Sequence, residues 1–226
     1  MENDFWHERW EKNEIGFHQS QFHPFLLQYW PSLNLKQGSR VFVPLCGKSR
    51  DLLWLRDQGL DVIGVELSQL AVEDFFKENQ LTATVTQHGE LELYESPGIR
   101  IFCGDFFKLT AADLAGVTGV FDRASLVALP PVMRRDYAAH MQKILPPGTQ
   151  TLLVCFAYPQ EQMNGPPFSV GNAEVNALFA PSTEITFLTE INSLDNEPRF
   201  KQRGLTSLMK KSFACATQPK RKSRLW

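Results

Sequence analysis

The feature that most constrains the fold of this sequence is a strand-turn-helix-strand pattern between Val41 and Glu66. One apolar run, residues 41–43, leads into the turn 44–49, and a second apolar run, residues 62–65, ends at Glu66. In an open parallel sheet, ligands bind beyond the carboxyl ends of the strands, and an acid placed there can accept hydrogen bonds from both hydroxyls of a ribose. The pattern therefore predicts a nucleoside-binding frame.

Gly47 and Glu66 are the two candidate ligand-binding residues of this frame. Gly47 either makes a tight turn between strand and helix or lets a ligand approach the backbone closely. Glu66 is either a surface acid or the residue that binds the ribose, and its place 19 residues beyond Gly47 favours the ribose. A dinucleotide fingerprint needs three glycines here, whereas this turn has one, which disfavours a dinucleotide.

The remaining sequence alternates strand-like and helix-like segments, which predicts an α/β fold with a Rossmann-like, doubly wound sheet. We expect a single domain over residues 1–226, with a helical N-terminal cover over 1–35 and a flexible basic tail over 218–226. A hairpin at 82–86 and 91–94 is expected as an insertion before the third strand. The expected strands are 40–43, 61–65, 99–103, 119–121, 151–158, 185–191 and 205–215.

Two further strand ends carry charged residues. Asp105 and Phe106 follow the segment 99–103, where they could frame an adenine ring, although an Asp after Gly104 is also an ordinary turn residue. Asp122-Arg123 ends the segment where the sheet order should reverse. This pair is either a structural ion pair, or Arg123 anchors a carboxylate or heteroaromatic ring with its planar donors.

Aromatic residues precede the first strand. Trp6 and Trp10 lie on one face of an expected helix, and Phe17 follows. They either belong to the core or cover the strand ends as a lid. In the second arrangement, aromatic faces over a cationic ligand would gain about 0.5 to 2 kcal/mol of cation–π energy.

Composition excludes several classes of partner. The formal net charge of −2 favours neither nucleic acid nor an anionic membrane. No apolar run approaches the roughly 18 to 20 residues of a membrane helix, and no signal peptide is visible. The four cysteines are well separated, as expected of free thiols in the cytoplasm, and the five histidines form no metal-binding set, so we expect no metal.

Beyond these residues, the sequence resembles the thiopurine S-methyltransferase family, a branch of the Rossmann-like S-adenosylmethionine-dependent methyltransferases. The resemblance spans residue 5 to about residue 208. The segments that carry it are Phe5-Trp6-His7-Glu8-Arg9-Trp10, Gly16-Phe17-His18-Gln19, Val43-Pro44-Leu45-Cys46-Gly47-Lys48-Ser49, Val65-Glu66, Phe121-Asp122-Arg123-Ala124-Ser125-Leu126-Val127-Ala128-Leu129 and Gly165-Pro166-Pro167-Phe168.

The resemblance implies a seven-stranded sheet with the last strand antiparallel, S-adenosylmethionine as methyl donor, and a small thiol as acceptor. We expect a monomer. The residues that the resemblance places near the cofactor are Trp10, Leu45, Gly47, Glu66, Asp105, Phe106 and Arg123. Those that it places near the acceptor are Phe17, Pro166, Pro167 and Arg199.

A sulfonium methyl group is already activated, and a purine-conjugated thiol ionises readily, so the reaction needs alignment more than a strong base. Arg123 and Arg199 are therefore expected to act catalytically as electrostatic orienters of a thiolate, without an obligatory general base.

The sequence leaves three other functions open: methylation of selenium or tellurium compounds as the main role, a non-catalytic S-adenosylmethionine-binding protein, and a dinucleotide oxidoreductase.

The C-terminal sequence departs from the family pattern. Alternation fades after Cys215 into a basic segment, which predicts a short final strand.

Overall fold

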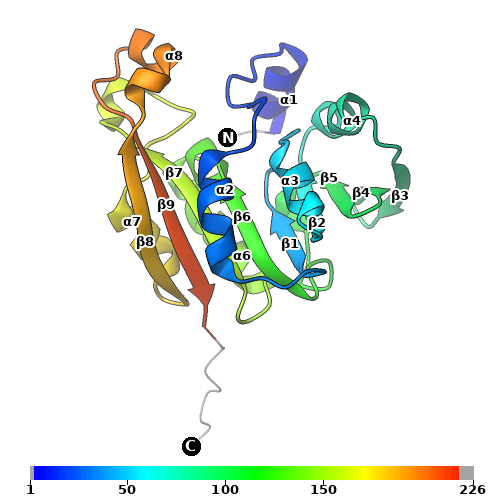
Figure 1. The fold of residues 1–226 in the computed structure, drawn as a ribbon. Coiled ribbons are helices and arrows are strands. Elements are labelled where there is room, and N and C mark those ends of the chain that lie inside the picture. Colours follow the sequence, from blue (N-terminus) through cyan, green and yellow to red (C-terminus); the bar gives the residue numbers. More distant parts are fainter. Residues whose placement is uncertain (1–2, 219–226) are drawn as a thin grey trace, which may run out of the picture.

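The sheet has nine strands in the order β3-β4-β5-β2-β1-β6-β7-β9-β8 (Figure 1). The computed structural model describes residues 3–218 of the 226. The strands are β1 (Arg40–Val43), β2 (Asp61–Glu66), β3 (Thr84–His88), β4 (Leu91–Ser96), β5 (Ile99–Cys103), β6 (Val117–Arg123), β7 (Gln150–Ala157), β8 (Thr183–Asn192) and β9 (Met209–Thr217).

The central strands β5, β2, β1, β6 and β7 are parallel, and β1 pairs with both β2 and β6. Residues 41–43 and 62–66 are buried throughout, as expected of parallel strands covered on both faces. The strand order reverses between β1 and β6, as predicted. A ligand site is therefore expected beyond the carboxyl ends of these two strands.

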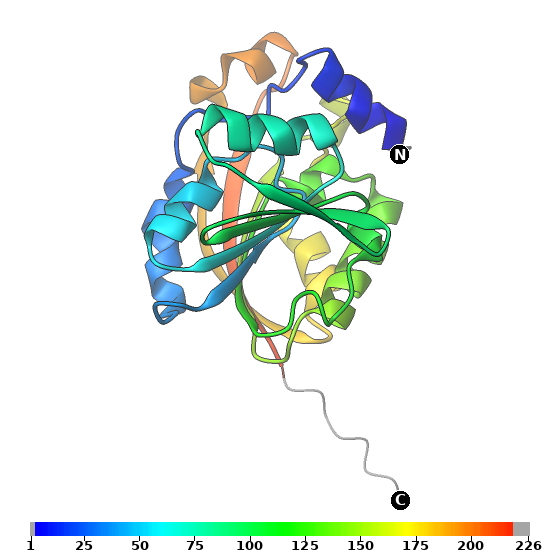
Figure 2. The ribbon, with the colours of Figure 1, turned by 90° about the vertical axis from the view of Figure 1, so that its right-hand side faces the viewer.

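Helices cover both faces of the sheet (Figure 2). Residues of α2, α3 and α4 pack in one apolar core, and residues of α6 and α7 pack in the other. The helices are α1 (Asn3–Glu11), α2 (Pro24–Tyr29), α3 (Asp51–Asp57), α4 (Gln69–Glu78), α5 (Ser125–Ala128), α6 (Pro131–Ile144), α7 (Asn172–Phe179) and α8 (Pro198–Gln202), with short 3-10 turns at Trp30–Leu33, Phe106–Lys108, Gln160–Gln162 and Leu194–Asn196.

Local sequence explains several helix ends. Ser68 caps α4, because its side chain accepts a hydrogen bond from the Ala71 N–H at 3.3 Å. Pro131 stands in the first turn of α6, where its missing N–H costs nothing. Asp4 lies in the first turn of α1, where its negative charge suits the helix N-terminus.

Two expectations about the sheet are wrong. The sheet has nine strands and not seven, because the hairpin β3-β4 does not stand apart: β4 pairs antiparallel with β5 and extends the sheet. The final strand is not short either. β9 is antiparallel, as predicted, but it spans nine residues, because Met209–Thr217 pairs with β7 on one side and β8 on the other. Of the expected basic tail, residues 219–226 lie outside the described part.

Three helices gather at one end of the sheet. Both views show α1, α4 and α8 there, above the carboxyl ends of the parallel strands (Figures 1 and 2). The N-terminal helix α1 contacts α4. Within residues 3–218, no helix has both the length and the apolar character needed to cross a bilayer.

Candidate active site

A cavity of about 410 Å³ lies at this end of the sheet, and residues of α1 and α8 are among those that line it. All eleven residues that the sequence predicted for the site line it, although they come from seven separate parts of the chain. The structure therefore brings together one set of residues that the sequence could assign only piece by piece: Trp10, Phe17, Leu45, Gly47, Glu66, Asp105, Phe106, Arg123, Pro166, Pro167 and Arg199.

Glu66 is a buried acid at the end of β2, with 6% of its surface exposed. Its Oε1 accepts the Ser68 N–H and its Oε2 accepts the Gly47 N–H, both at 2.8 Å. Burial raises the pKa of Glu66, and these backbone donors oppose the rise. Each carboxylate oxygen retains a second acceptor site, so the anchored group can still accept hydrogen bonds from a diol.

Gly47 has a left-handed backbone, with φ of +52°. A Cβ atom at this position would lie 3.1 Å from Cζ2 of Trp10. The missing side chain thus makes room for the Trp10 ring, and close approach of a ligand to this backbone stays a prediction. Leu45 and Ala124 also adopt positive φ, at +45° and +71°, and both line the cavity. Such backbone strain outside glycine clusters at functional sites.

Arg123 joins three parts of the chain at the end of β6. Its Nη1 donates to the backbone carbonyl of Phe17 at 3.2 Å, and its Nη2 lies 3.4 Å from Ser49 Oγ. The same Nη2 lies 3.5 Å from Oδ2 of Asp51, whose side chain is 1% exposed. The guanidinium is therefore held in one orientation by a buried carboxylate and the N-terminal segment.

Asp122 does not pair with Arg123, although the two are neighbours in the sequence. Successive side chains of a strand point to opposite faces, so Asp122 faces α6, where the Tyr137 hydroxyl donates to it at 2.7 Å. Burial raises the pKa of Asp122 to about 6, against the opposing effect of Tyr137 and Ser125. An ion pair between Asp122 and Arg123 is therefore not formed, because Arg123 pairs with Asp51, and the role of Arg123 as an anchor stays a prediction.

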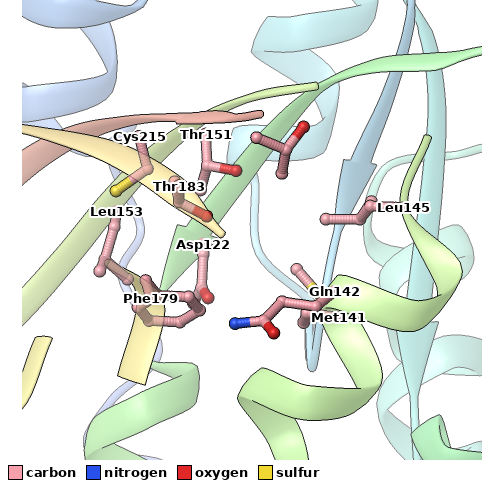
Figure 3. Close-up of a pocket in the computed structure, with 10 residues that line it drawn as sticks. Asp122, Met141, Gln142, Leu145, Thr151, Leu153, Phe179, Thr183 and Cys215 are labelled. Carbon is pink, nitrogen blue, oxygen red and sulfur yellow. The ribbon is translucent and has the colours of Figure 1, made fainter. Parts of the chain in front are cut away.

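A second cavity of about 20 Å³ lies beside Asp122 (Figure 3). Thr151, Thr183, Phe179 and Cys215 are among the side chains around it. The volume suffices for about one water molecule, so this cavity cannot hold a cofactor or an acceptor.

Asp105 and Phe106 differ in their availability to a ligand. Asp105 accepts the Phe107 N–H at 2.9 Å and so begins a short 3-10 turn. Phe106 is buried, with its ring centroid 4.9 Å from those of Tyr137 and His140. Phe107 also lines the cavity and is 37% exposed, so it offers more ring surface than Phe106.

The opposite wall of the cavity comes from the segment 165–168 and α8. Pro166 and Pro167 line this wall, and the Tyr158 hydroxyl donates to the Pro167 carbonyl. The Arg199 guanidinium stacks 4.7 Å from the Phe200 ring centroid, and its Nε lies 3.5 Å from a Glu197 oxygen. Here apolar surface and a cation face the same space.

Sequence reasoning missed five charged residues of the cavity: Arg9, Glu14, Lys48, Asp51 and Arg203. Lys48 forms ion pairs with Asp74 at 3.0 Å and Glu78 at 2.7 Å. No sequence pattern links Asp51 to Arg123, 72 residues away. The only available signal for Arg203 is its spacing of four residues from Arg199, which places both on one side of a helical turn.

Solved structures share this architecture. An S-adenosylmethionine-dependent methyltransferase from Anabaena variabilis superposes with a TM-score of 0.66 at 13% identity, covering 96% of this chain and 95% of the other. A TehB-like S-adenosylmethionine-dependent methyltransferase from Corynebacterium glutamicum gives a TM-score of 0.56 at 14% identity, covering 96% and 98%. These likenesses define the fold as Rossmann-like, the architecture that both of these methyltransferases share.

Sequence relatives identify the family. The profile described as thiopurine S-methyltransferase matches residues 1–218. The thiopurine S-methyltransferase of Nitrosospira multiformis is 50% identical over 218 residues, 96% of this chain and 99% of that protein. Those of Pseudomonas fluorescens and Bordetella pertussis are 47% and 48% identical, over 96% and 92% of this chain and 98% and 95% of theirs. The chain belongs to the thiopurine S-methyltransferase family, and it is an S-adenosylmethionine-dependent S-methyltransferase.

The cavity fits this cofactor in its chemistry. A nucleoside diol requires a fixed acceptor, which Glu66 supplies, and a sulfonium cation is stabilised by aromatic faces such as that of Trp10. When bound, S-adenosylmethionine supplies a methyl group that is already activated for transfer.

Proposed function

We propose that this protein transfers the methyl group of S-adenosylmethionine to the sulfur of aromatic and heterocyclic thiols, thiopurines among them. One observation carries the proposal: the Arg123 and Arg199 guanidinium groups line the same cavity as the buried carboxylate of Glu66. A diol-binding acid and two cations suited to a thiolate are thereby combined in one space. The names of the relatives support the same acceptor class.

In this proposal, the residues near β1, β2 and β5 bind the cofactor. Glu66 accepts the ribose hydroxyls, and Leu45 and Gly47 border the methionine end, where Trp10 lies against Gly47. Asp105 and Phe106 frame the adenine. The existing N–H bonds of Glu66 support this role, because they fix the carboxylate before any ligand arrives.

The acceptor lies in this proposal between Phe17 and the wall formed by Pro166 and Pro167. Arg123 and Arg199 favour its ionised form, because a nearby positive charge lowers the pKa of a thiol. The proton leaves to solvent, and the thiolate sulfur attacks the methyl carbon. The bond from that carbon to the sulfonium breaks, and its electron pair stays on the departing thioether sulfur. This balance requires no general base on the protein.

We also propose that the N-terminal segment acts as a lid. Trp6 and Trp10 both lie edge-on to Phe17, with ring centroids 5.8 and 5.5 Å from it. The Phe17 carbonyl accepts a hydrogen bond from Arg123. Docking of the N-terminal segment therefore also orients the Arg123 guanidinium. A closed lid would exclude water from the reacting sulfur.

Calorimetry with S-adenosylmethionine, S-adenosylhomocysteine and NAD, followed by assays of methyl transfer to 6-mercaptopurine, tests the proposal. We expect binding of both sulfur compounds, none of NAD, and formation of the methyl thioether. Cofactor binding without transfer to any thiol would indicate a binding protein. Transfer to selenium or tellurium compounds alone would replace the acceptor class.

A further inference from the structure

Two arginines of the acceptor wall lie one helical turn apart. Arg199 belongs to α8 and Arg203 directly follows it, its N–H donating to the Arg199 carbonyl at 3.3 Å. Both side chains line the cavity. Like charges at this spacing repel each other, so the arrangement favours an anion between or beside them.

Arg203 differs from the other cations of the cavity in having no ion-pair partner among residues 3–218. Arg9 pairs with Glu14, and Arg199 lies 3.5 Å from Glu197. Each of the remaining two also meets a carboxylate: Lys48 meets those of Asp74 and Glu78, and Arg123 meets that of Asp51. One positive charge at the cavity is therefore uncompensated by the protein.

The charge of Arg203 contributes to the pKa shifts of two residues of the cavity region, Arg199 and Tyr158. Burial lowers the pKa of Arg199, Glu197 raises it, and the charge of Arg203 lowers it. Burial raises the pKa of the Tyr158 hydroxyl, and Arg203 is among the groups that oppose this rise. Tyr158 in turn bonds to the carbonyl of Pro167.

We propose that Arg203 binds a carboxylate carried on the ring of the thiol acceptor, so that the preferred substrates are anionic aromatic thiols. The inference rests on the proposed function, and it adds a substrate class to it. A guanidinium presents parallel N–H donors that match both oxygens of a carboxylate. Arg123 and Arg199 face the sulfur, and Arg203 holds the distant end of the ring.

The test compares 4-mercaptobenzoate with 4-mercaptobenzamide, which has nearly the same shape without the charge. We expect Arg203→Gln to lower the ratio of kcat/KM for the acid to kcat/KM for the amide about threefold to tenfold, mainly through KM of the acid. Arg203→Lys should retain part of the preference. Because the ratio is compared between variants, the different thiol acidities of the two compounds cancel.

Lys201→Gln is the matched control. Lys201 is an exposed cation of α8, the helix that Arg203 follows; it pairs with Asp195 at 2.9 Å and does not line the cavity. We expect its ratio to equal that of the wild type, since only the net charge changes.

The outcomes distinguish failure of the carboxylate site from failure of the proposed methyl transfer. Methylation of both thiols with the same ratio in wild type and Arg203→Gln overturns the carboxylate site alone. Equal drops of the ratio in Arg203→Gln and Lys201→Gln also overturn it, because a general charge effect then suffices. Wild-type enzyme that methylates neither thiol overturns the proposed function and the inference together.

Discussion

The backbone carbonyl of Phe17 accepts a hydrogen bond from Arg123 Nη1 at 3.2 Å, across 106 residues of sequence. On the other side of the guanidinium, Asp51 Oδ2 lies 3.5 Å from Nη2, and Asp51 Oδ1 accepts the His23 N–H at 2.8 Å. The N-terminal segment is thus attached to Arg123 twice, once directly and once through Asp51. Orientation of the proposed thiolate-binding cation depends on this attachment.

Asp51→Asn should lower kcat/KM for 6-mercaptopurine about tenfold, because Arg123 loses its buried counter-charge and its orientation. The asparagine oxygen can still accept the His23 N–H, so we expect the fold to persist and the affinity for S-adenosylhomocysteine to stay within about twofold. Steady-state kinetics and calorimetry measure the two effects.

Asp61→Asn is the control for this variant, because Asp61 pairs with Arg40 and Arg100 at 2.8 and 2.7 Å outside the cavity. Comparable losses of activity in both variants would show that Asp51 is only a structural ion-pair partner.

Glu66→Gln should weaken binding of S-adenosylhomocysteine by more than about tenfold, since hydrogen bonds to a charged acceptor contribute about 1.5 to 3 kcal/mol each. The variant also weakens the bond from Gly47, so its melting temperature should fall. Ser68→Ala separates the two effects: it removes the cap of α4, costs about 1 kcal/mol of stability, and leaves the carboxylate in place. Equal losses of affinity in the two variants would argue against a ribose contact.

Arg123→Ala should reduce methyl transfer most at neutral pH and recover in part as the pH rises. The guanidinium favours the thiolate, and at high pH the acceptor is ionised without help. A profile of kcat/KM from about pH 6 to about pH 9 measures this. A loss that is constant across the profile would assign Arg123 to structure or cofactor positioning instead.

Gly16→Ala tests the position of Arg199. A Cβ at Gly16 would lie 2.7 Å from Arg199 Nη1, so the guanidinium must move, while the backbone there needs no positive φ. We expect KM for the thiol to rise about threefold or more, with cofactor affinity unchanged. Gly171→Ala, where nothing lies within 4 Å of the added atom, is the control. An unchanged KM in Gly16→Ala would place Arg199 outside the acceptor site.

Asp122→Asn should change the pH dependence of stability. Burial raises the pKa of Asp122 from 3.8 to about 6, so between these values the folded protein holds a proton that the unfolded chain has released. The free energy of unfolding of the wild type therefore loses about 3 kcal/mol from this group as the pH rises through that range. The variant lacks this loss, so its free energy of unfolding minus that of the wild type should increase from about pH 4 to about pH 7.

Urea denaturation at each pH measures the free energy of unfolding of both proteins. The contribution of His23, which has the opposite sign, is the same in both and cancels when one value is subtracted from the other. Burial lowers the pKa of His23 to about 3, so its share of stability increases as the pH rises toward 6.5. A difference that does not vary with pH would mean that Asp122 is ionised in the folded protein throughout.

Hydrophobic runs and local capping chemistry are encoded within short stretches of sequence, and for that reason they could be predicted. The strands at 40–43 and 99–103 have the predicted bounds, and the cap at Ser68 and the start of α6 follow from neighbouring residues. The carboxyl ends of parallel strands meet at one edge, so the convergence of Gly47, Glu66 and Arg123 was also predictable.

Contacts between distant segments were decided by the tertiary structure alone. The pairing of β4 with β5 and the attachment of Phe17 and Asp51 to Arg123 leave no local signal, because each depends on where another segment packs. The same holds for the charge of Arg203. The sequence does not show that Arg203 lacks an ion-pair partner within residues 3–218, because that depends on where the folded chain places the carboxylates around the cavity. By itself, the sequence determined the nucleoside-binding frame between Val41 and Glu66, because that frame is one continuous stretch of chain. Packing determined which cations line the cavity next to it, because they come from distant segments.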